Sequence, residues 1–328
     1  MNNRILDFAD APARLSAREG RLHIESPDRP AVDIPFDHLA AIVCSHGQVS
    51  FTQAVLAELA AANAILISCD ARHLPVAMML PLVAHHRQTT SFQRQALAPL
   101  PLRKRLWRDI VAAKVQAQAR TLLDVKKLDA GLGAIARRVR VANASPMEAL
   151  AGRFYWAALF GEQRLRRSDD EDTRNAFLDY GYAIVRAIVA RAICAAGLHP
   201  GLALHHHNQD DPYPLANDLM EPFRPLVDLW TVRWCADHPS PWSLDKTSKQ
   251  DLLSWLTARY SDGVESRSLF DWAGRSADQL ARCLESKRSS LDFPELRCAL
   301  DSQEMARPKK DPQRVPRHVA LRDVRSAG

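Results

Sequence analysis

The sequence LRKRLWRDIVAAKVQAQARTLLDVKKL (residues 102–128) decides the architecture, because its apolar residues recur at every third or fourth position along the whole stretch. This spacing predicts one long helix, which starts just after the helix-breaking prolines at 99 and 101. Before about residue 80 the apolar residues instead alternate with a period of two. The chain is therefore predicted to change from a β-rich part to a helical part near this point.

The N-terminal part contains short alternating segments that end at Pro, Gly, Ser or Asp. Such spacing predicts the strands of a small antiparallel sheet or sandwich. The predicted strands cover residues 4–8, 13–18, 20–26, 31–36, 39–45 and 64–68. A helix is predicted within 51–63, with Thr52 as its N-cap. Because it stands between strands, we expect it to cover one face of the sheet.

The remaining periodic segments all have helical spacing and are separated by prolines, as helix breakers should separate them. They cover residues 87–98, 102–128, 147–160, 174–196, 218–236, 248–258 and 276–285. The sequence therefore predicts an α+β protein with a small β-sandwich-like N-terminal domain (1–84) and an all-α domain (85–306). A basic, proline-rich tail (307–328) is expected to be flexible.

Composition narrows the class of protein. At 328 residues, 47% hydrophobic and 25% charged, the chain has the composition of a folded globular protein. Its six cysteines are scattered without a C-x-x-C pair, which favours reduced thiols in a cytoplasm. The N-terminus has no basic stretch followed by an apolar run, and charged or polar residues interrupt the longest apolar stretches. We therefore expect a cytoplasmic protein without a membrane span.

Positive charge is concentrated in one region. The net charge is +6, yet residues 85–140 alone contain thirteen Lys or Arg against three Asp, a local net charge of +10. A basic cluster on predicted helices is the electrostatic pattern of a protein that binds a phosphate backbone. Solvated helix faces remain the alternative explanation.

Residues 204–225, LHHHNQDDPYPLANDLMEPFRP, place three histidines before a helix that carries Asp218 and Glu221. The two carboxylates are three residues apart and lie on one helix face. An imidazole beside two carboxylates is a typical set of ligands for a divalent cation, and the mixed nitrogen and oxygen donors favour Mg²⁺ or Mn²⁺, with Zn²⁺ not excluded. The simpler alternatives are acidic residues stabilised by the helix dipole and a hydrogen-bonded core histidine.

Glu148 is a third acidic candidate, in the helix ASPMEALAGRFYWAALF. Ser145 is the predicted N-cap and Pro146 the first helical residue, so Glu148 falls at the position that completes a capping box. Considered alone, this structural role is favoured over a metal role.

Several of these segments together resemble a known family. HHNQ, LANDLMEPFRPLVD, MEALAGRFYWAALF and NAFLDYGYAIVRA are similar to the universal CRISPR-associated integrase, the first of the two adaptation proteins that capture new spacers. More narrowly, they resemble the version that accompanies single-effector, type II systems. DLMEPFRP is the most specific segment, and the resemblance covers about residues 1–300.

The resemblance implies a metal-dependent DNA endonuclease and integrase. It also implies that the N-terminal domain (1–84) dimerises and that the helical domain (85–306) is catalytic and binds DNA. The family's metal ligands, one glutamate, one histidine and a second acidic residue, correspond to Glu148, His206 and Glu221, with Asp218 in the same pocket. His206 is chosen because it begins the H-x-N-Q pattern. His205 and His207 then position the loop or face solvent.

The resemblance also explains the basic region as a platform for double-stranded DNA. The predicted DNA-binding residues are Arg87, Arg94, Arg103, Lys104, Arg105, Arg108 and Arg153. Arg224 is either a phosphate contact or a structural ion pair. In the implied reaction a 3′-hydroxyl of an incoming fragment attacks a phosphodiester at the CRISPR repeat, and the 3′-oxygen of the cut strand leaves. Mg²⁺ or Mn²⁺ would assist this phosphoryl transfer. The implied partners are a second copy of the chain and the second adaptation protein.

Two other functions remain open from the sequence. A zinc-dependent hydrolase could use the histidine triplet, and a non-catalytic DNA-binding adaptor could use the acidic residues only as helix caps.

Overall fold

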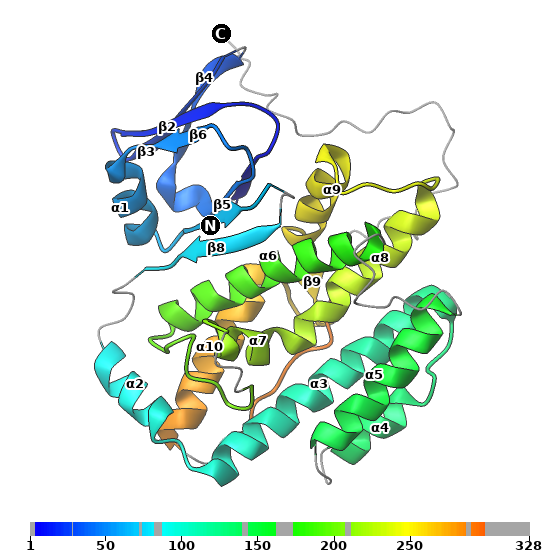
Figure 1. Ribbon diagram of the computed structural model, residues 1–328. Coiled ribbons are helices and arrows are strands. Elements are labelled where there is room, and N and C mark those ends of the chain that lie inside the picture. Colours follow the sequence, from blue (N-terminus) through cyan, green and yellow to red (C-terminus); the bar gives the residue numbers. More distant parts are fainter. Residues whose placement is uncertain are drawn as a thin grey trace.

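The computed structural model describes residues 4–27, 29–71, 74–81, 87–139, 144–161, 173–206, 211–286 and 290–298. Strands dominate the N-terminal part and helices the rest (Figure 1), which confirms the predicted α+β class. His207 and the tail 307–328 lie outside the described residues. The domain limits at 84 and 306 stay predictions.

Two four-stranded sheets form the N-terminal part, with strand orders β1-β5-β7-β8 and β4-β3-β2-β6. Its elements are β1 (Arg4–Phe8), β2 (Ala13–Arg18), β3 (Arg21–Ser26), β4 (Arg29–Pro35), the 3₁₀ turn η1 (Phe36–His38), β5 (Leu39–Cys44), β6 (Val49–Phe51), α1 (Gln53–Ala61), β7 (Ile65–Cys69) and β8 (Pro75–Met79). The predicted sandwich-like arrangement is confirmed. Thr52 is the residue that precedes α1, as predicted, although its side chain makes no capping hydrogen bond.

Both sheets contain parallel pairs, so the predicted alternative of a small antiparallel sheet is wrong. β1 runs parallel to β5, β5 runs parallel to β7, and β2 runs parallel to β6. The reason is the connection between β5 and β7. It contains β6 and α1, which makes it long enough to return the chain to the same end of the sheet, as parallel pairing requires.

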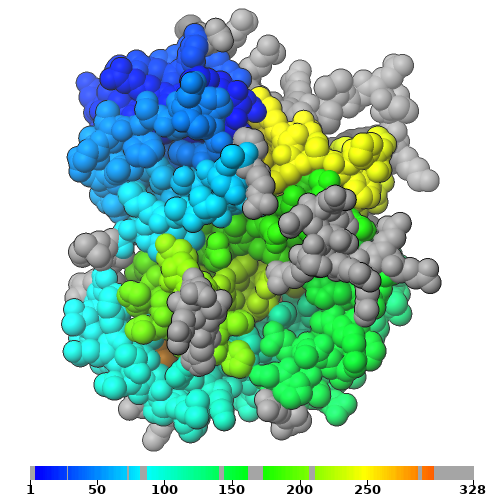
Figure 2. Space-filling model, viewed as in Figure 1, coloured from blue at the N-terminus to red at the C-terminus, as the bar shows by residue number. Residues whose placement is uncertain are grey.

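Strands β5 and β7 separate two hydrophobic cores. Ile42 and Leu66 face the core shared with Leu15 and α1, whereas Val43 and Ile67 face the core of the helical part. Successive residues of a strand point to opposite faces, so the two strands contribute to both cores at once. The N-terminal part consequently packs directly on the helical part, as the space-filling view in Figure 2 shows, with α6 against β7 and β8.

The helical part consists of ten helical segments within the described residues and one small sheet. The segments are α2 (Gln88–Ala96), α3 (Leu100–Lys126), α4 (Leu132–Val139), α5 (Ala144–Phe160), α6 (Thr173–Ala195), α7 (Pro214–Met220), the 3₁₀ turn η2 (Glu221–Phe223), α8 (Arg224–Asp237), α9 (Lys246–Leu256) and α10 (Leu269–Ser286). The sheet, in the order β10-β9-β11, contains β9 (Arg259–Ser261), β10 (Ser266–Ser268) and β11 (Arg297–Cys298).

Helix α3 is the longest described helix and the support for its neighbours. At 1.5 Å per residue its 27 residues extend for about 40 Å. Leu106, Ile110, Val115 and Leu122 are fully buried on different sides of the helix, which packs against α4, α5 and α8. Figure 1 shows α3 running beside α4 and α5, with α7 and α8 across from them. None of the described helices is both long and apolar enough to span a membrane.

The predicted helix 218–236 is interrupted in the structure. It is divided into α7, η2 and α8, with Pro222 in the 3₁₀ turn and Pro225 in the first turn of α8. A proline has no N–H to donate, so two of them three residues apart break the regular hydrogen-bond pattern. The sequence periodicity also missed α4 and the sheet β10-β9-β11, which are too short to show a period. Helix α10 begins at Leu269, seven residues before the predicted start.

Gly181, in the segment NAFLDYGYAI, allows α6 and α8 to approach closely. A Cβ atom at this position would overlap Val227 Cγ1 and lie 3.2 Å from Val227 Cγ2. Gly274 of α10, by contrast, has open space where its Cβ would be.

We expect Gly181→Ala to destabilise the protein by about 1–3 kcal/mol, because the added methyl group overpacks the contact with Val227. Gly274→Ala is the matched control. It should be neutral or stabilising by up to about 1 kcal/mol, since alanine is the better helix former. Urea unfolding measures both, and equal effects of the two substitutions would contradict the close approach.

Candidate metal centre

One side of α3 carries the polar contacts that organise the site. Arg103, Trp107, Lys114 and Thr121 recur at helical spacing and face the segment 204–225. Arg103 Nε donates to the Leu204 carbonyl (3.2 Å), and Thr121 Oγ1 donates to the carbonyl of Pro225 (3.3 Å). Helix α3 is thereby attached to both ends of this segment.

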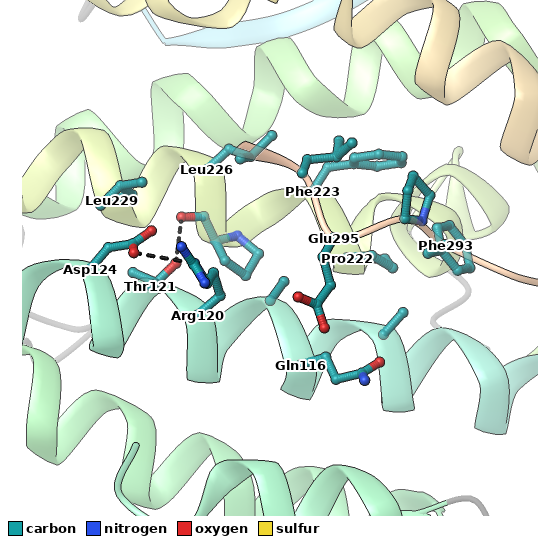
Figure 3. Close-up of a pocket in the computed structure, with 15 residues that line it drawn as sticks. Gln116, Arg120, Thr121, Asp124, Pro222, Phe223, Leu226, Leu229, Phe293 and Glu295 are labelled. Atoms are coloured by element: carbon teal, nitrogen blue, oxygen red, sulfur yellow. Dashed lines mark hydrogen bonds and ion pairs between the residues drawn. The ribbon is translucent and has the colours of Figure 1, made fainter. Parts of the chain in front are cut away.

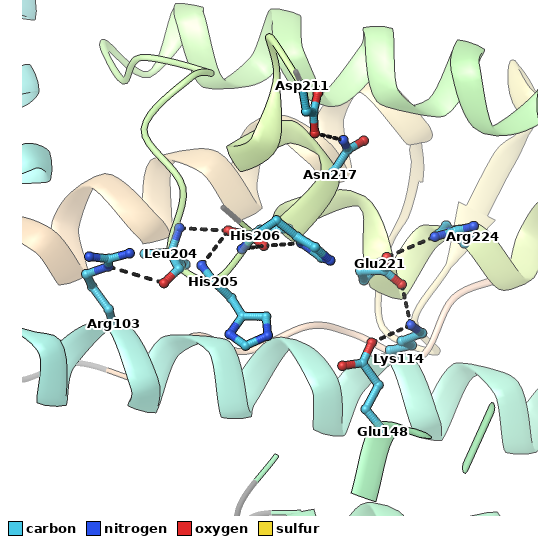
Figure 4. A network of polar contacts seen from close by, with 11 residues as sticks. Arg103, Lys114, Glu148, Leu204, His205, His206, Asp211, Asn217, Glu221 and Arg224 are labelled. Carbon is cyan, nitrogen blue, oxygen red and sulfur yellow. Dashed lines mark hydrogen bonds and ion pairs between the residues drawn. The ribbon is translucent and has the colours of Figure 1, made fainter. Parts of the chain in front are cut away.

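Lys114 lies between the two glutamates that the sequence singled out. Its Nζ atom is 2.7 Å from Glu148 Oε1 of α5 and 2.6 Å from Glu221 Oε2 of η2. Figure 4 shows the two carboxylates approaching the ammonium group from different elements. The capping role favoured for Glu148 from the sequence is not the contact seen, because α5 begins at Ala144 and the Glu148 carboxylate faces Lys114.

Glu221 is only 4% exposed and needs positive charge nearby. Arg224 supplies it at Oε1 (2.9 Å) and Lys114 at Oε2. Burial alone would raise the pKa of Glu221, but these two cations outweigh it and lower that pKa to about 2. Burial likewise opposes the charge of Lys114, yet the two carboxylates raise its pKa above the ordinary value. Glu221 and Lys114 therefore both stay charged at neutral pH.

Arg224 is itself fixed by a buried network. Its guanidinium lies 4.1 Å from the centre of the Tyr182 ring, a cation–π contact. The Tyr182 hydroxyl donates to Asp228, which also accepts from the Tyr155 hydroxyl (2.7 Å). Tyr155 is two helical turns after Glu148 on α5, so Asp228 of α8 holds α6 and α5 in place. Burial raises the pKa of Asp228 to about 6, although both tyrosine donors oppose the shift.

Asp218, fully buried in α7, holds the histidine loop. Its carboxylate accepts from the backbone N–H groups of Leu204 (2.7 Å), His205 (2.9 Å) and His206 (3.2 Å). It also lies 2.6 Å from His206 Nδ1. That hydrogen bond is the main cause of the raised pKa of His206. Because Nδ1 faces Asp218, the other ring nitrogen, Nε2, is left for a ligand.

Aromatic packing and a glutamine clamp complete the support of the loop. The ring of His205 stacks on Trp107 of α3, with centroids 4.4 Å apart and planes 10° apart. Gln95 of α2, 5% exposed, donates to the carbonyls of His199 (2.8 Å) and Leu202 (2.7 Å). His205 is therefore a positioning residue, as the sequence suggested.

The opposite side of the η2 turn lines an apolar cleft. Pro222, Phe223 and Leu226 form one wall of it, residues 113–124 of α3 another, and Phe293 with its neighbours a third (Figure 3). Arg120 and Asp124 pair at its edge (3.2 Å). The turn thus separates a charged site on one side from an apolar cleft on the other.

The donor set fits a divalent cation. Glu148 and Glu221 already bind one positively charged group between them, and Glu221 Oε2, although paired with Lys114, lacks hydrogen-bond alignment. Carboxylate oxygens and an imidazole nitrogen are ligands of Mg²⁺ and Mn²⁺. Within the described ranges, however, no three His, Cys, Asp or Glu side chains are close enough together to hold an ion as they stand.

The structure thus brings Glu148 and Glu221 together and places His206 on the neighbouring loop, where Figure 4 shows its ring pointing toward the Glu221 side. The Asp218 carboxylate holds the loop through its backbone N–H groups, and its role as a secondary ligand stays a prediction. The periodicity gave no sign of Lys114 as the common partner of the glutamates. In the sequence Lys114 is one of thirteen basic residues within 85–140. Only the fold shows that it lies on the side of α3 that faces the two glutamates.

The predicted DNA-binding residues are spread over three helices or their ends. Arg94 pairs with Glu285 of α10 (2.5 Å), Arg108 lies 3.6 Å from Asp109, and Arg103 supports Leu204. Lys104 and Arg153 are exposed. Arg87 immediately precedes α2, and Arg105 lies on α3. Their role in DNA binding stays a prediction.

Comparison with known proteins identifies the family. A family model described as "CRISPR associated protein Cas1" matches residues 8–239. The chain belongs to the Cas1 family. The "CRISPR-associated endonuclease Cas1" of Neisseria meningitidis serogroup C (strain 8013) is 34% identical over 235 residues, which cover 71% of this chain and 76% of that relative.

Two solved structures share the Cas1 fold seen here. A "Casposase bound to integration product" superposes with a TM-score of 0.71 at 17% identity, and covers 95% of this chain and 96% of that one. A chain of a "Cas6-RT-Cas1--Cas2 complex" superposes with a TM-score of 0.69 at 16% identity, and covers 89% of this chain and 36% of that one. These similarities support the α+β architecture, and the family match confirms the resemblance found in the sequence.

Asp218→Ala should release the histidine loop of this Cas1 chain. Without the carboxylate, the N–H groups of residues 204–206 lose their acceptor, so we expect their hydrogen exchange to become at least about tenfold faster. Asp237→Ala, at an exposed site at the end of α8, is the control and should leave these amides unchanged. Unchanged exchange in Asp218→Ala would refute the positioning role.

The pH dependence of stability should change in Asp228→Asn. Because the pKa of Asp228 is raised from 3.8 to about 6, the folded protein binds more protons than the unfolded chain between these values. The stabilisation from neutral Asp228 is complete below about pH 4 and is lost as pH rises through about 6, by up to about 3 kcal/mol.

The asparagine side chain of this variant cannot ionise, so the difference in unfolding free energy between the wild type and the variant should shrink from pH 3.5 to pH 7. Urea unfolding across this range measures the difference. A difference that is independent of pH would show that the Asp228 carboxyl does not titrate as described.

Proposed function

We propose that this protein is a divalent-metal-dependent DNA endonuclease and integrase that joins the 3′-hydroxyl ends of short DNA fragments into a CRISPR repeat array. The observation that carries the proposal is the convergence of Glu148 and Glu221, 73 residues apart in the chain, on one cation position beside the His206 loop. The names of the Neisseria endonuclease and of the casposase bound to its integration product support this chemistry.

Glu148, Glu221 and the Nε2 atom of His206 would hold the ion, which we propose to be Mg²⁺ or Mn²⁺. When bound, such an ion lowers the pKa of an attacking hydroxyl and neutralises charge on the phosphoryl group. The protein's own residues prepare the site for it. Arg224 keeps Glu221 ionised and oriented, and Asp218 fixes both the loop and the hydrogen-bonded nitrogen of His206.

Double-stranded DNA is the proposed substrate, bound mainly through its phosphates. The exposed Lys104 and Arg153 lie on α3 and α5, the helices that also carry Lys114 and Glu148. The proposed DNA-binding residues and the metal site are therefore carried by the same two helices. Contacts of this kind neutralise phosphates and give affinity without reading base sequence.

The proposed partners are a second copy of this chain and Cas2, the second adaptation protein. A structural neighbour is part of a complex that contains Cas2. Joining both ends of one fragment needs two active sites at a fixed separation, which a symmetric pair of subunits supplies.

Glu148→Gln and Glu221→Gln should each reduce strand joining by at least about a hundredfold, because each substitution removes one negative ligand while keeping the side-chain size. The assay combines a short duplex with free 3′ ends, a supercoiled plasmid that carries the repeat, Cas2, and either Mn²⁺, Mg²⁺ or a chelator. Binding of the duplex, measured at one fixed salt concentration, should change by less than about threefold.

Glu58→Ala, at an exposed glutamate of α1, is the control and should join strands normally. Normal joining by either glutamine variant would overturn the assignment of the site. Joining that persists in chelator would overturn the metal requirement. No joining by the wild type with any divalent ion would favour a DNA-binding adaptor.

A further inference from the structure

The Lys114 ammonium lies at the centre of the proposed metal site. Among the described residues it contacts two carboxylates, Glu148 at 2.7 Å and Glu221 at 2.6 Å, and these come from different helical elements. Its side chain is 16% exposed. With Arg224 on the far oxygen of Glu221, the cluster contains two negative and two positive charges, so it is neutral.

A divalent cation and this ammonium group cannot use the two glutamates together. Oxygen ligands lie about 2.0–2.6 Å from Mg²⁺, Mn²⁺ or Ca²⁺, which is almost the separation of the same oxygens from Lys114 Nζ. The two cations would therefore occupy nearly the same point. Their mutual repulsion at such a short distance is far too large to be tolerated in a largely buried site.

Of the two cations in the cluster, Lys114 is the one able to leave. Arg224 is held on a second side by the ring of Tyr182 and contacts Glu221 through the oxygen that faces away from Glu148. Lys114 has a flexible four-carbon stem and a compact charge, so its ammonium group can move by rotating side-chain bonds alone. Arg224 would then remain to balance Glu221 while Lys114 moves.

We propose that Lys114 is an exchangeable counter-ion: it holds Glu148 and Glu221 in position in the ion-free protein and is displaced when the divalent cation binds between them. This inference rests on the proposed function, since it requires that the glutamate pair binds the cation. Two consequences follow. The ligands are positioned before the ion arrives, and the affinity for the ion is lowered because the ion must displace a charge already bound.

The first test uses the unmodified protein. Lysines are acetylated with a small amine-reactive ester, in chelator or in Mn²⁺, and the modified positions are quantified by mass spectrometry. Lys114 should react at least about fivefold faster in Mn²⁺, because the ammonium leaves its two carboxylates. Lys126, exposed at the end of α3, is the internal reference and should react equally in both conditions.

The second test compares Mn²⁺ affinity in Lys114→Met and in the matched control Lys126→Met, by calorimetry or by the paramagnetic signal of free Mn²⁺. Lys114→Met should bind Mn²⁺ at least about fivefold more tightly than the wild type, and Lys126→Met should bind it equally. The thermal midpoint of Lys114→Met should be lower in chelator and should rise more on addition of Mn²⁺.

The outcomes separate the inference from the proposed function. If the wild type binds no Mn²⁺ in a manner that Glu221→Gln removes, the proposed metal site fails. If that binding is present but Lys114 labelling does not increase, or Lys114→Met binds Mn²⁺ no more tightly, only the counter-ion role is overturned. If Lys114→Met does not fold, the labelling of the wild type decides.

Discussion

The rest of the site depends on the burial of one charge. Glu221 is 4% exposed in a turn between two helices, and a carboxylate in that environment must be paired. The requirement fixes Arg224 on one oxygen and Lys114 on the other, and Lys114 in turn attracts Glu148 from α5. The single buried carboxylate of Glu221 thus positions α3, α5 and α8. As a result Glu148 and Glu221 lie side by side as a pair of potential ligands.

Helix α3 and Asp228 supply the rigidity that this pairing needs. One face of α3 contacts the histidine loop through Arg103 and Trp107 and the glutamates through Lys114, so an error in its placement would affect every ligand. Asp228 ties Tyr155 of α5 to Tyr182 of α6. The close approach at Gly181 lies in the segment NAFLDYGYAI, which also contributes Tyr182 to the network around Arg224.

The sequence predicted the change of periodicity and most helices, because long apolar periods are local signals. Glu221 lies in the specific segment DLMEPFRP, whereas Glu148 is assigned through the family resemblance alone, and the metal role of both stays a prediction. The sequence could not predict Lys114 or Asp228, since their roles depend on which residues face them from other elements. Asp218 shows the same limit: spacing placed it near Glu221, but only the folded loop shows its carboxylate occupied by backbone N–H groups. Parallel pairing of β5 with β7 likewise depends on the path of the connection.

The placement of β5 and β7 between two cores affects how the protein unfolds and how its sequence can change in evolution. Val43 and Ile67 belong to the interior of the helical part, and Ile42 and Leu66 to the interior of the N-terminal part. Unfolding of either half would therefore expose apolar surface of the other half to water, so the two halves should unfold as one cooperative unit. A chimaera that took only its first eighty residues from a relative would therefore need side chains on β5 and β7 that fit both cores.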